Sequence, residues 1–182
     1  MTESVLTYAN LLTFLRMLLV PVFALCLLYG RPGWALVSFM VAAATDMFDG
    51  LVARRVGQAT SIGAWLDPMA DKLLIITTFV MLTVPGLDLK NRLPVWLTVL
   101  VVSRDIGIVL TVAVWNLAVA RRTFRPSMLG KVTTAVYLMT CTMALYENYL
   151  GESSAIVPIL IYTSLGLTVA SAAHYAWRMM KA

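Results

Sequence analysis

The sequence predicts an all-α integral membrane protein, in which residues 1–182 form one domain built as a bundle of six transmembrane helices. Hydrophobic residues make up 60% of the chain and charged residues only 13%, about half of the charged share of a soluble domain. Apolar runs recur along the chain, each near the roughly 20 residues that a helix needs to cross a bilayer. Turn-forming or charged residues separate these runs, and we find no linker and no internal repeat.

Helix-breaking residues define several of the expected spans. Gly30-Arg31-Pro32-Gly33 separates the first span from the second, and Pro85-Gly86 ends the third. The expected spans cover residues 11–29, 34–53, 63–84, 94–119, 128–145 and 156–177, with an acidic loop at 147–154 after the fifth. Residues 1–10 precede the first span and could form a short helix along the membrane surface.

Loop charge predicts the orientation of the chain in the membrane. With six spans, both termini and the loops after the second and fourth spans share one side. That side collects seven basic residues, Arg54, Arg55, Arg121, Arg122, Arg125, Arg178 and Lys181, whereas the other side has Arg31, Lys90 and Arg92. Because cytoplasmic loops are enriched in Lys and Arg, we expect both termini to face the cytoplasm. The net charge of +5 would then face anionic lipid, and we expect no nucleic-acid partner.

Four of the nine acidic residues fall within one stretch, at the end of the second span and the start of the third. Asp46 and Asp49 are three residues apart, Asp67 and Asp71 are four apart, and either spacing places a pair on one face of a helix. An ionised residue at the centre of a span costs about 2.5–3.5 kcal/mol, so these carboxylates need compensation.

Two arrangements could supply that compensation. In the first, the carboxylates form ion pairs with Arg54, Lys72, Arg104 and Lys131. In the second, facing carboxylates hold a divalent cation in a water-filled cleft. A donor set of carboxylates without His or Cys suits Mg²⁺, Mn²⁺ or Ca²⁺ rather than zinc. Hard cations held in this way usually serve phosphate-bearing substrates.

The same stretch resembles the motif of a known family. Its fixed residues are Asp46, Asp49, Gly50, Ala53, Arg54, Gly63, Asp67 and Asp71. This arrangement is similar to the D-x2-D-G-x2-A-R-x8-G-x3-D-x3-D motif of the CDP-alcohol phosphatidyltransferases, with every spacer at the family length. Eight fixed positions make a chance match far less probable than for a lone glycine motif. The six-span layout extends the resemblance over essentially the whole chain.

The resemblance implies a site and a reaction. Asp46, Asp49, Asp67 and Asp71 would surround one or two Mg²⁺ or Mn²⁺ ions, and Asp71 would also take the proton from the acceptor hydroxyl. The ions would bridge the diphosphate of CDP-diacylglycerol, whose phosphatidyl group passes to a glycerol-type alcohol while CMP leaves. Asp49, Gly50, Ala53, Arg54 and Gly63 would form the nucleotide and phosphate pocket.

A second polar set lies in the first span. Asn10, Thr13 and Arg16 share one helical face. We expect Asn10 and Thr13 to line the nucleotide pocket, and the alternative is a polar contact between helices.

The acceptor is less clearly marked. Arg104 and Lys131 are the expected acceptor-binding residues, although Arg104 could instead form a structural pair with Asp105, and Lys131 could extend to the membrane interface. The stretches Ser103-Arg104-Asp105, 125–136 and 171–175 are most similar to the cardiolipin-forming members of the family, in which the acceptor is phosphatidylglycerol. Members that use glycerol 3-phosphate carry an Arg where this chain has Val112. Glycerol 3-phosphate therefore stands as the alternative acceptor.

Two further expectations concern the oligomeric state and location of the protein and its functional class. The family is generally homodimeric, in the bacterial or mitochondrial inner membrane, with the active site facing the cytoplasm or matrix. From a different class, a cation transporter could use the same carboxylates along a pore. The far halves of the second and third spans are nearly all apolar, which favours the enzyme.

Overall fold

The computed structural model describes residues 8–56, 63–118 and 128–180, with side chains at 11–45, 70, 72–110 and 128–177. Over these residues the chain forms six helices and no strand, which confirms the all-α prediction. The helices are α1 (Tyr8–Leu28), α2 (Pro32–Val56), α3 (Gly63–Thr83), α4 (Val95–Ala118), α5 (Met128–Leu150) and α6 (Ile156–Met180). Five of them begin and end within three residues of the expected spans.

The fifth helix is longer than the sequence predicts. We expected it to end at Leu145 and the acidic loop to begin at residue 147, but α5 continues to Leu150. The added turn is stabilised by Asn148, whose side chain accepts a hydrogen bond from the Asn91 backbone N–H (2.8 Å) and donates one to the Asn91 carbonyl (3.2 Å). Gly151 then ends the helix at a φ of 71°, which favours glycine. A tertiary contact therefore lengthens the helix past the charged Glu147.

Three helices within the described residues are long and apolar enough to cross a membrane: Leu11–Leu28 of α1, Met128–Leu150 of α5 and Ile156–Trp177 of α6. Shorter apolar stretches occupy Pro32–Thr45 of α2 and Lys72–Thr83 of α3. Large hydrophobic side chains also cover the outer surface, among them Leu18 and Tyr162, which are 66% and 67% exposed. An apolar surface of this kind is typical of a protein in contact with lipid. Three spans are thus supported, and six remain a prediction.

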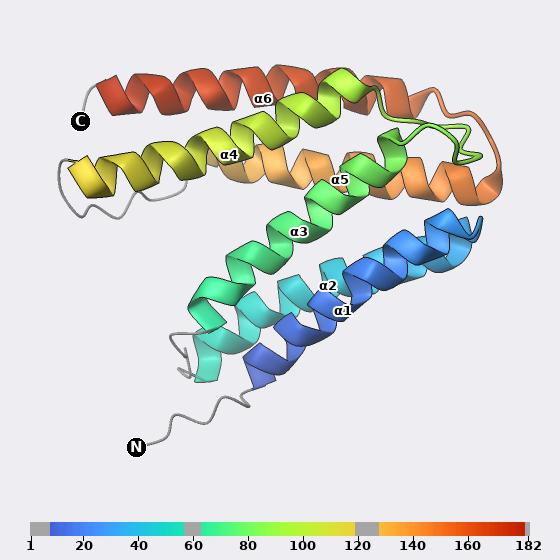
Figure 1. Ribbon diagram of the computed structural model, residues 1–182, viewed down its shortest axis with the longest axis horizontal. Coiled ribbons are helices and arrows are strands. Elements are labelled where there is room, and N and C mark those ends of the chain that lie inside the picture. The colour runs from blue at the N-terminus through green and yellow to red at the C-terminus, as the bar shows by residue number, and fades with distance from the viewer. Residues whose placement is uncertain (1–7, 57–62, 119–127, 181–182) are drawn as a thin grey trace.

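The helices form two groups (Figure 1). Helices α4, α5 and α6 run nearly parallel, α1 and α2 lie side by side, and α3 crosses between the two groups. The groups meet at the end that holds the α1–α2, α3–α4 and α5–α6 connections. They fan apart toward the other end, where α1, α3 and α5 begin and α2, α4 and α6 end. Successive helices thus run in opposite directions between the two ends, as expected for a chain that crosses back and forth.

Aromatic packing holds α3 between the two groups. Phe79 of α3 is fully buried. Its ring packs edge-on against that of Tyr137 of α5, with 5.4 Å between the ring centroids. A polar seam then joins α5 to α6. The Tyr137 hydroxyl is hydrogen-bonded to Thr168, and the Thr140 hydroxyl to that of Ser164 at 3.0 Å. Hydrogen bonds between buried hydroxyl groups are a usual means of associating helices in lipid.

Candidate active site

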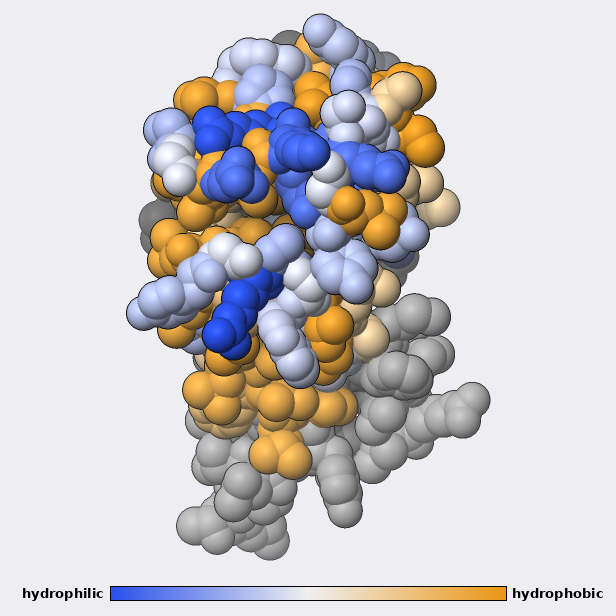
Figure 2. Space-filling view, turned by 90° about the vertical axis from the view of Figure 1, so that its right-hand side faces the viewer, coloured by the Kyte–Doolittle hydropathy of each residue, from blue (hydrophilic) through white to orange (hydrophobic). Residues whose placement is uncertain are grey.

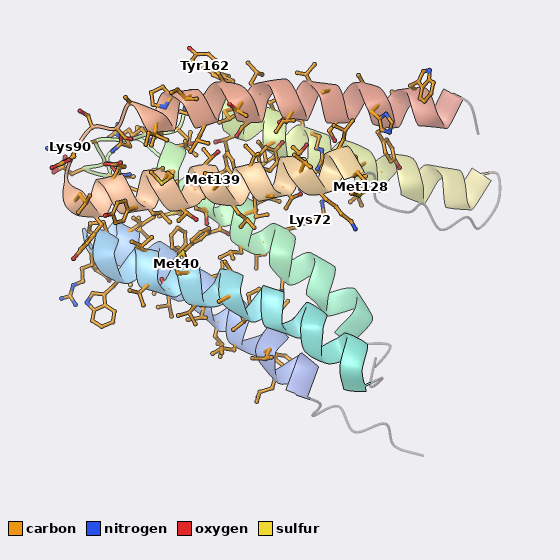
Figure 3. The ribbon with its side chains drawn as sticks, turned by 180° about the vertical axis from the view of Figure 1, so that it is seen from behind. Met40, Lys72, Lys90, Met128, Met139 and Tyr162 are labelled. Carbon is orange, nitrogen blue, oxygen red and sulfur yellow. The ribbon has the colours of Figure 1, made fainter. Side chains whose placement is uncertain are left out.

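The acidic motif lies on two neighbouring helix ends. Asp46 and Asp49 belong to the last three turns of α2, and Asp67 and Asp71 to the first nine residues of α3. The end of α2 and the start of α3 lie at the same end of the molecule in Figures 1 and 3. The side chains of these four residues lie outside the described residues, so the structure establishes their helices and their order along them. Gly63 is the first residue of α3.

The other predicted nucleotide residues are also helical. Gly50, Ala53 and Arg54 follow Asp49 on α2, but their side chains lie outside the described residues. Asn10 and Thr13 lie on α1, where the Asn10 side chain is likewise not described. Thr13 is 1% exposed, and Arg16 is fully buried and is the largest of the fully buried side chains. The polar face that the sequence predicts on α1 therefore points into the protein.

A cavity of about 460 Å³ opens beside the middle of α3. It lies among α3, α4, α5 and α6, and it contains the two residues that the sequence predicts as acceptor ligands, Arg104 and Lys131. Lys72, labelled in Figure 3, enters its wall from α3 directly after Asp71. The remaining lining residues are Ile108, Gly130, Thr134, Ala135, Leu138, Ser171 and Tyr175. The predicted base, Asp71, directly precedes the lining residue Lys72 along α3.

Asp105 links two of the cations at this cavity. Its Oδ2 accepts a hydrogen bond from Lys72 Nζ at 2.9 Å, and its Oδ1 accepts one from Arg104 Nη1 at 2.7 Å. Arg104 Nη2 also donates to Ser171 Oγ at 2.8 Å, which ties α4 to α6. The side chains of Arg104 and Asp105 are only 9% and 11% exposed, so solvent screens this pair less than it screens a surface pair. The guanidinium is thus held from both sides.

The charges around the cavity do not cancel within the described residues. Lys72, Arg104 and Lys131 carry three positive charges, and Asp105 supplies one negative charge. The lining also includes an apolar wall formed by Ile108, Ala135 and Leu138. A space with surplus positive charge and an apolar wall suits an anion that carries hydrocarbon.

Sequence reasoning singled out Arg104 and Lys131 but not their neighbours. The sequence predicts Lys72 as one of the possible ion-pair partners of the acidic motif, and the structure pairs it with Asp105. Ser171 and Tyr175 were not assigned to the site, although both line the cavity. Their spacing of four residues on α6 was the available signal, because Ser164 and Thr168 extend the same polar face.

Comparison with known proteins identifies the family. A family model described as CDP-alcohol phosphatidyltransferase matches residues 6–170. The chain belongs to the CDP-alcohol phosphatidyltransferase family. It is therefore a transferase of phospholipid biosynthesis, as the motif predicts, and the enzyme interpretation is favoured over the transporter. The match includes Arg104 and Lys131, whereas Ser171 and Tyr175 lie beyond its end.

Individual relatives of this transferase carry two kinds of name. A Mycobacterium tuberculosis protein named probable phosphatidylglycerophosphate synthase is 37% identical over 95% of this chain and 81% of its own. A Streptomyces coelicolor cardiolipin synthase (CMP-forming) is 35% identical over 91% of this chain and 77% of its own. A Pseudomonas fluorescens CDP-diacylglycerol–glycerol-3-phosphate 3-phosphatidyltransferase is 42% identical over 53% of this chain and 50% of its own. These relatives agree on phosphatidyl transfer and differ in the acceptor that their names imply.

Proposed function

We propose that this membrane enzyme transfers the phosphatidyl group of CDP-diacylglycerol to the terminal hydroxyl of phosphatidylglycerol, which forms cardiolipin and releases CMP. The observation that carries the proposal is the cavity beside α3, which combines surplus positive charge with an apolar wall. The cations account for a phosphate on the acceptor, and the apolar wall accounts for its hydrocarbon.

The cations suit a phosphate group already present in the acceptor. Arg104 is held by Asp105 and Ser171, so its remaining donors are fixed in direction. A guanidinium fixed in this way recognises phosphate with defined geometry, and Lys131 adds a flexible point charge. Both proposed acceptors carry such a phosphate.

The apolar wall favours the lipid acceptor. Phosphatidylglycerol presents a singly charged phosphodiester next to its diacylglycerol portion, and Ile108, Ala135 and Leu138 would lie against that portion. Glycerol 3-phosphate has no hydrocarbon to place there, and as a dianion it calls for more positive charge. Val112 of α4 stands where family members that use glycerol 3-phosphate carry an additional Arg.

The acidic motif would bind the metal. Four carboxylates from two adjacent helix ends form an oxygen-only donor set that fits one or two Mg²⁺ or Mn²⁺ ions. These ions, when bound, neutralise the diphosphate and stabilise the leaving CMP. The ligands we propose are Asp46, Asp49, Asp67 and Asp71.

The protein residues orient the two substrates and move one proton. The acceptor oxygen forms a bond to the phosphatidyl phosphorus, the bond from that phosphorus to the CMP oxygen breaks, and Asp71 takes the hydroxyl proton. The nucleotide would lie against Gly50 and Ala53. Because Gly50 has no Cβ and Ala53 has only a methyl group, the nucleotide could approach the backbone of α2 closely. The other nucleotide and phosphate ligands we propose are Asn10, Thr13, Asp49, Arg54 and Gly63.

The cellular arrangement follows from the same proposal. All six helices would cross the membrane, and both termini and the acidic motif would face the cytoplasm or the mitochondrial matrix. The enzyme would act as a homodimer in a bacterial or mitochondrial inner membrane. The alternating direction of the six described helices supports this topology (Figure 1).

A second acceptor, glycerol 3-phosphate, is favoured by the names of two of the relatives, those from Mycobacterium tuberculosis and Pseudomonas fluorescens. The relative from Mycobacterium tuberculosis, at 37% identity, is named for phosphatidylglycerophosphate synthesis. If the same reaction occurs here, the acceptor is glycerol 3-phosphate, and the site and the donor are unchanged.

An assay with two acceptors tests the proposal. The purified enzyme receives CDP-diacylglycerol and Mg²⁺ with either phosphatidylglycerol or glycerol 3-phosphate, and the lipid product is identified by mass spectrometry. We expect cardiolipin from the first mixture and little product from the second. Phosphatidylglycerophosphate formed only in the second mixture would replace our acceptor, and no CMP release in either would contradict the proposed transfer.

A further inference from the structure

The turn between α1 and α2 fixes one cation at the end of the molecule opposite the acidic motif (Figure 1). Gly30, at a φ of 66°, ends α1, and its N–H donates to the Leu27 carbonyl at 3.0 Å. The Arg31 N–H donates to the Cys26 carbonyl at 2.8 Å, which completes a Schellman motif. Helix α2 begins at the next residue, Pro32. Arg31 is therefore held at a defined position between two helices.

The side chain of Arg31 differs from those of the other cations at this end. Lys90 donates to the Gly151 carbonyl, and Arg92 donates to the Leu87 carbonyl. Across the described parts of the chain, the Arg31 side chain is exposed and makes no hydrogen bond or ion pair. Figure 2 looks onto this end of the molecule, where hydrophilic residues form a patch and hydrophobic residues cover the surface around it. The charge of Arg31 is thus available to a ligand.

Three hollows meet at Arg31. One of about 760 Å³ lies between the start of α2 and Tyr149 of α5. Two others, each of about 370 Å³, lie along α1, where Val22 and Cys26 line both of them, and one of the two also extends along α2. Arg31 is common to all three hollows, and apolar side chains form most of the remaining lining. Apolar grooves that begin at one unpaired cation match a molecule with an anionic head and hydrocarbon chains.

The backbone and the aromatic residues favour the same kind of ligand. The first amides of a helix lack intrahelical acceptors and attract anions, and Gly33 and Trp34 supply such amides beside Arg31. Tyr29 and Trp34 are 77% and 65% exposed, as is usual for residues at the level of lipid headgroups. The Tyr149 ring lies so close to Gly33 that a Cβ there would approach it within 2.9 Å. One wall of the largest hollow is therefore closely packed.

We propose that this surface binds one anionic glycerophospholipid as a structural lipid, with its phosphate at Arg31 and the α2 amides and its acyl chains in the hollows on either side of Trp34. The site is separate from the cavity beside α3, and the lipid bound here is not a substrate. Charge complementarity to the lipid phosphate and the apolar character of the grooves select a lipid as the occupant.

Phosphatidic acid is a suitable probe because it is neither the donor nor the acceptor of the proposed reaction. Its binding to the detergent-purified enzyme is followed by native mass spectrometry, and a photoreactive group on its acyl chain maps the contacts. An Arg near a lipid surface contributes about 1 kcal/mol, so Arg31→Ala should weaken the tightest binding about fivefold. Lys90→Ala is the matched control, since it removes another exposed cation at the same end and should leave that binding unchanged. Val37→Trp should displace the crosslinks from α1 and α2 by filling a groove.

Each outcome decides the proposal. Loss of binding with Arg31→Ala alone, together with crosslinks on residues 19–41, would support it. Equal loss with Lys90→Ala would show attraction to charge in general, and unchanged binding with Arg31→Ala would show that the phosphate lies elsewhere. Either result would overturn it. If Val37→Trp instead turned a dimer into a monomer without changing the crosslinks, the hollows would belong to a second copy of the chain, and the lipid site would be rejected.

Discussion

Asp105 is the residue on which the geometry of the cavity most depends. Its two carboxylate oxygens hold Lys72 and Arg104, which come from different helices, and Arg104 also contacts Ser171. Arg104 therefore forms the structural pair that the sequence allows and still lines the cavity. Because both oxygens of Asp105 are occupied by cations, we assign it a positioning role rather than contact with substrate.

Asp105→Asn should impair use of the acceptor more than use of the donor. An amide cannot bind both cations as a carboxylate does, so Arg104 and Lys72 would shift. Small displacements of positioning groups can cost up to about 100-fold in rate, and we expect at least a tenfold rise in the KM for phosphatidylglycerol. Steady-state kinetics with each substrate varied in turn measures this effect.

Two controls accompany this variant. Asp88→Asn removes an exposed carboxylate from the α3–α4 loop and should leave both KM values unchanged. Asp105→Glu should recover part of the acceptor affinity, since it restores the charge. An unchanged KM for the acceptor in Asp105→Asn would remove Asp105 from the positioning role.

At the scale of the helix, α3 connects the two halves of the protein. Its first turns carry Asp67 and Asp71, and its middle packs on α5 through Phe79 and Tyr137. The position of the acidic motif relative to the cavity therefore depends on this packing.

Phe79→Ala should destabilise the protein strongly. Truncation of a fully buried Phe typically costs about 3–5 kcal/mol, because it leaves a cavity that the neighbours fill only partly. Unfolding in mixed detergent, monitored by circular dichroism, measures the change in the free energy of unfolding. Phe14→Ala removes an aromatic ring that is 47% exposed and should cost much less. Equal losses in the free energy of unfolding for the two variants would contradict the conclusion that Phe79 anchors α3.

Helix positions were largely predictable from the sequence, and helix contacts were not. Apolar runs bounded by Gly30 and by Pro85-Gly86 mark the spans, because these residues end helices through their own backbone geometry. The extension of α5 to Leu150 depends on the contact of Asn148 with Asn91, 57 residues away, which no local pattern reveals.

The candidate site, like the fold, has one part that the sequence indicates and another that depends on how the helices pack. The acidic motif is recognisable in the sequence because its residues are close together and regularly spaced, and its role at the site stays a prediction. The cavity was only partly predictable, since its lining comes from four helices, and the faces that meet there depend on the packing of α4, α5 and α6. Arg104 and Lys131 stand out in the sequence because they are charged residues within apolar runs. Ser171 and Tyr175 share a polar face of α6 in the sequence, but their place at the cavity depends on the hydrogen bond of Ser171 to Arg104 and on the position of α6.

At the scale of the whole molecule, the fold separates two ends. One end carries the end of α2 and the start of α3, which hold the acidic motif, and the other carries the short α1–α2 turn with Arg31 (Figure 1). A phosphatidyl transfer that uses a nucleotide-linked donor requires the first end to face the compartment that supplies the nucleotide.

Labelling from outside the cell tests this topology. Ser153→Cys places a thiol in the exposed α5–α6 connection, and Ala182→Cys places one at the C-terminus. In bacterial cells, a membrane-impermeant maleimide should label Ser153→Cys on intact cells and Ala182→Cys only after the membrane is opened. The unmodified chain is the control for Cys26 and Cys141. Labelling of Ala182→Cys on intact cells would contradict the proposed orientation.

The central claim is that the carboxylates of α2 and α3 hold the divalent cation at which CDP-diacylglycerol is cleaved. The most direct measurement is the rate of CMP release by the purified wild-type enzyme and by Asp67→Asn, each across a range of Mg²⁺ and Mn²⁺ concentrations, with Asp88→Asn as the matched control. We expect release to require the cation, to persist in Asp88→Asn, and to fall by at least about 100-fold in Asp67→Asn, since a metal ligand is lost. Release by Asp67→Asn at nearly the wild-type rate, or release that continues in a chelator, would contradict it.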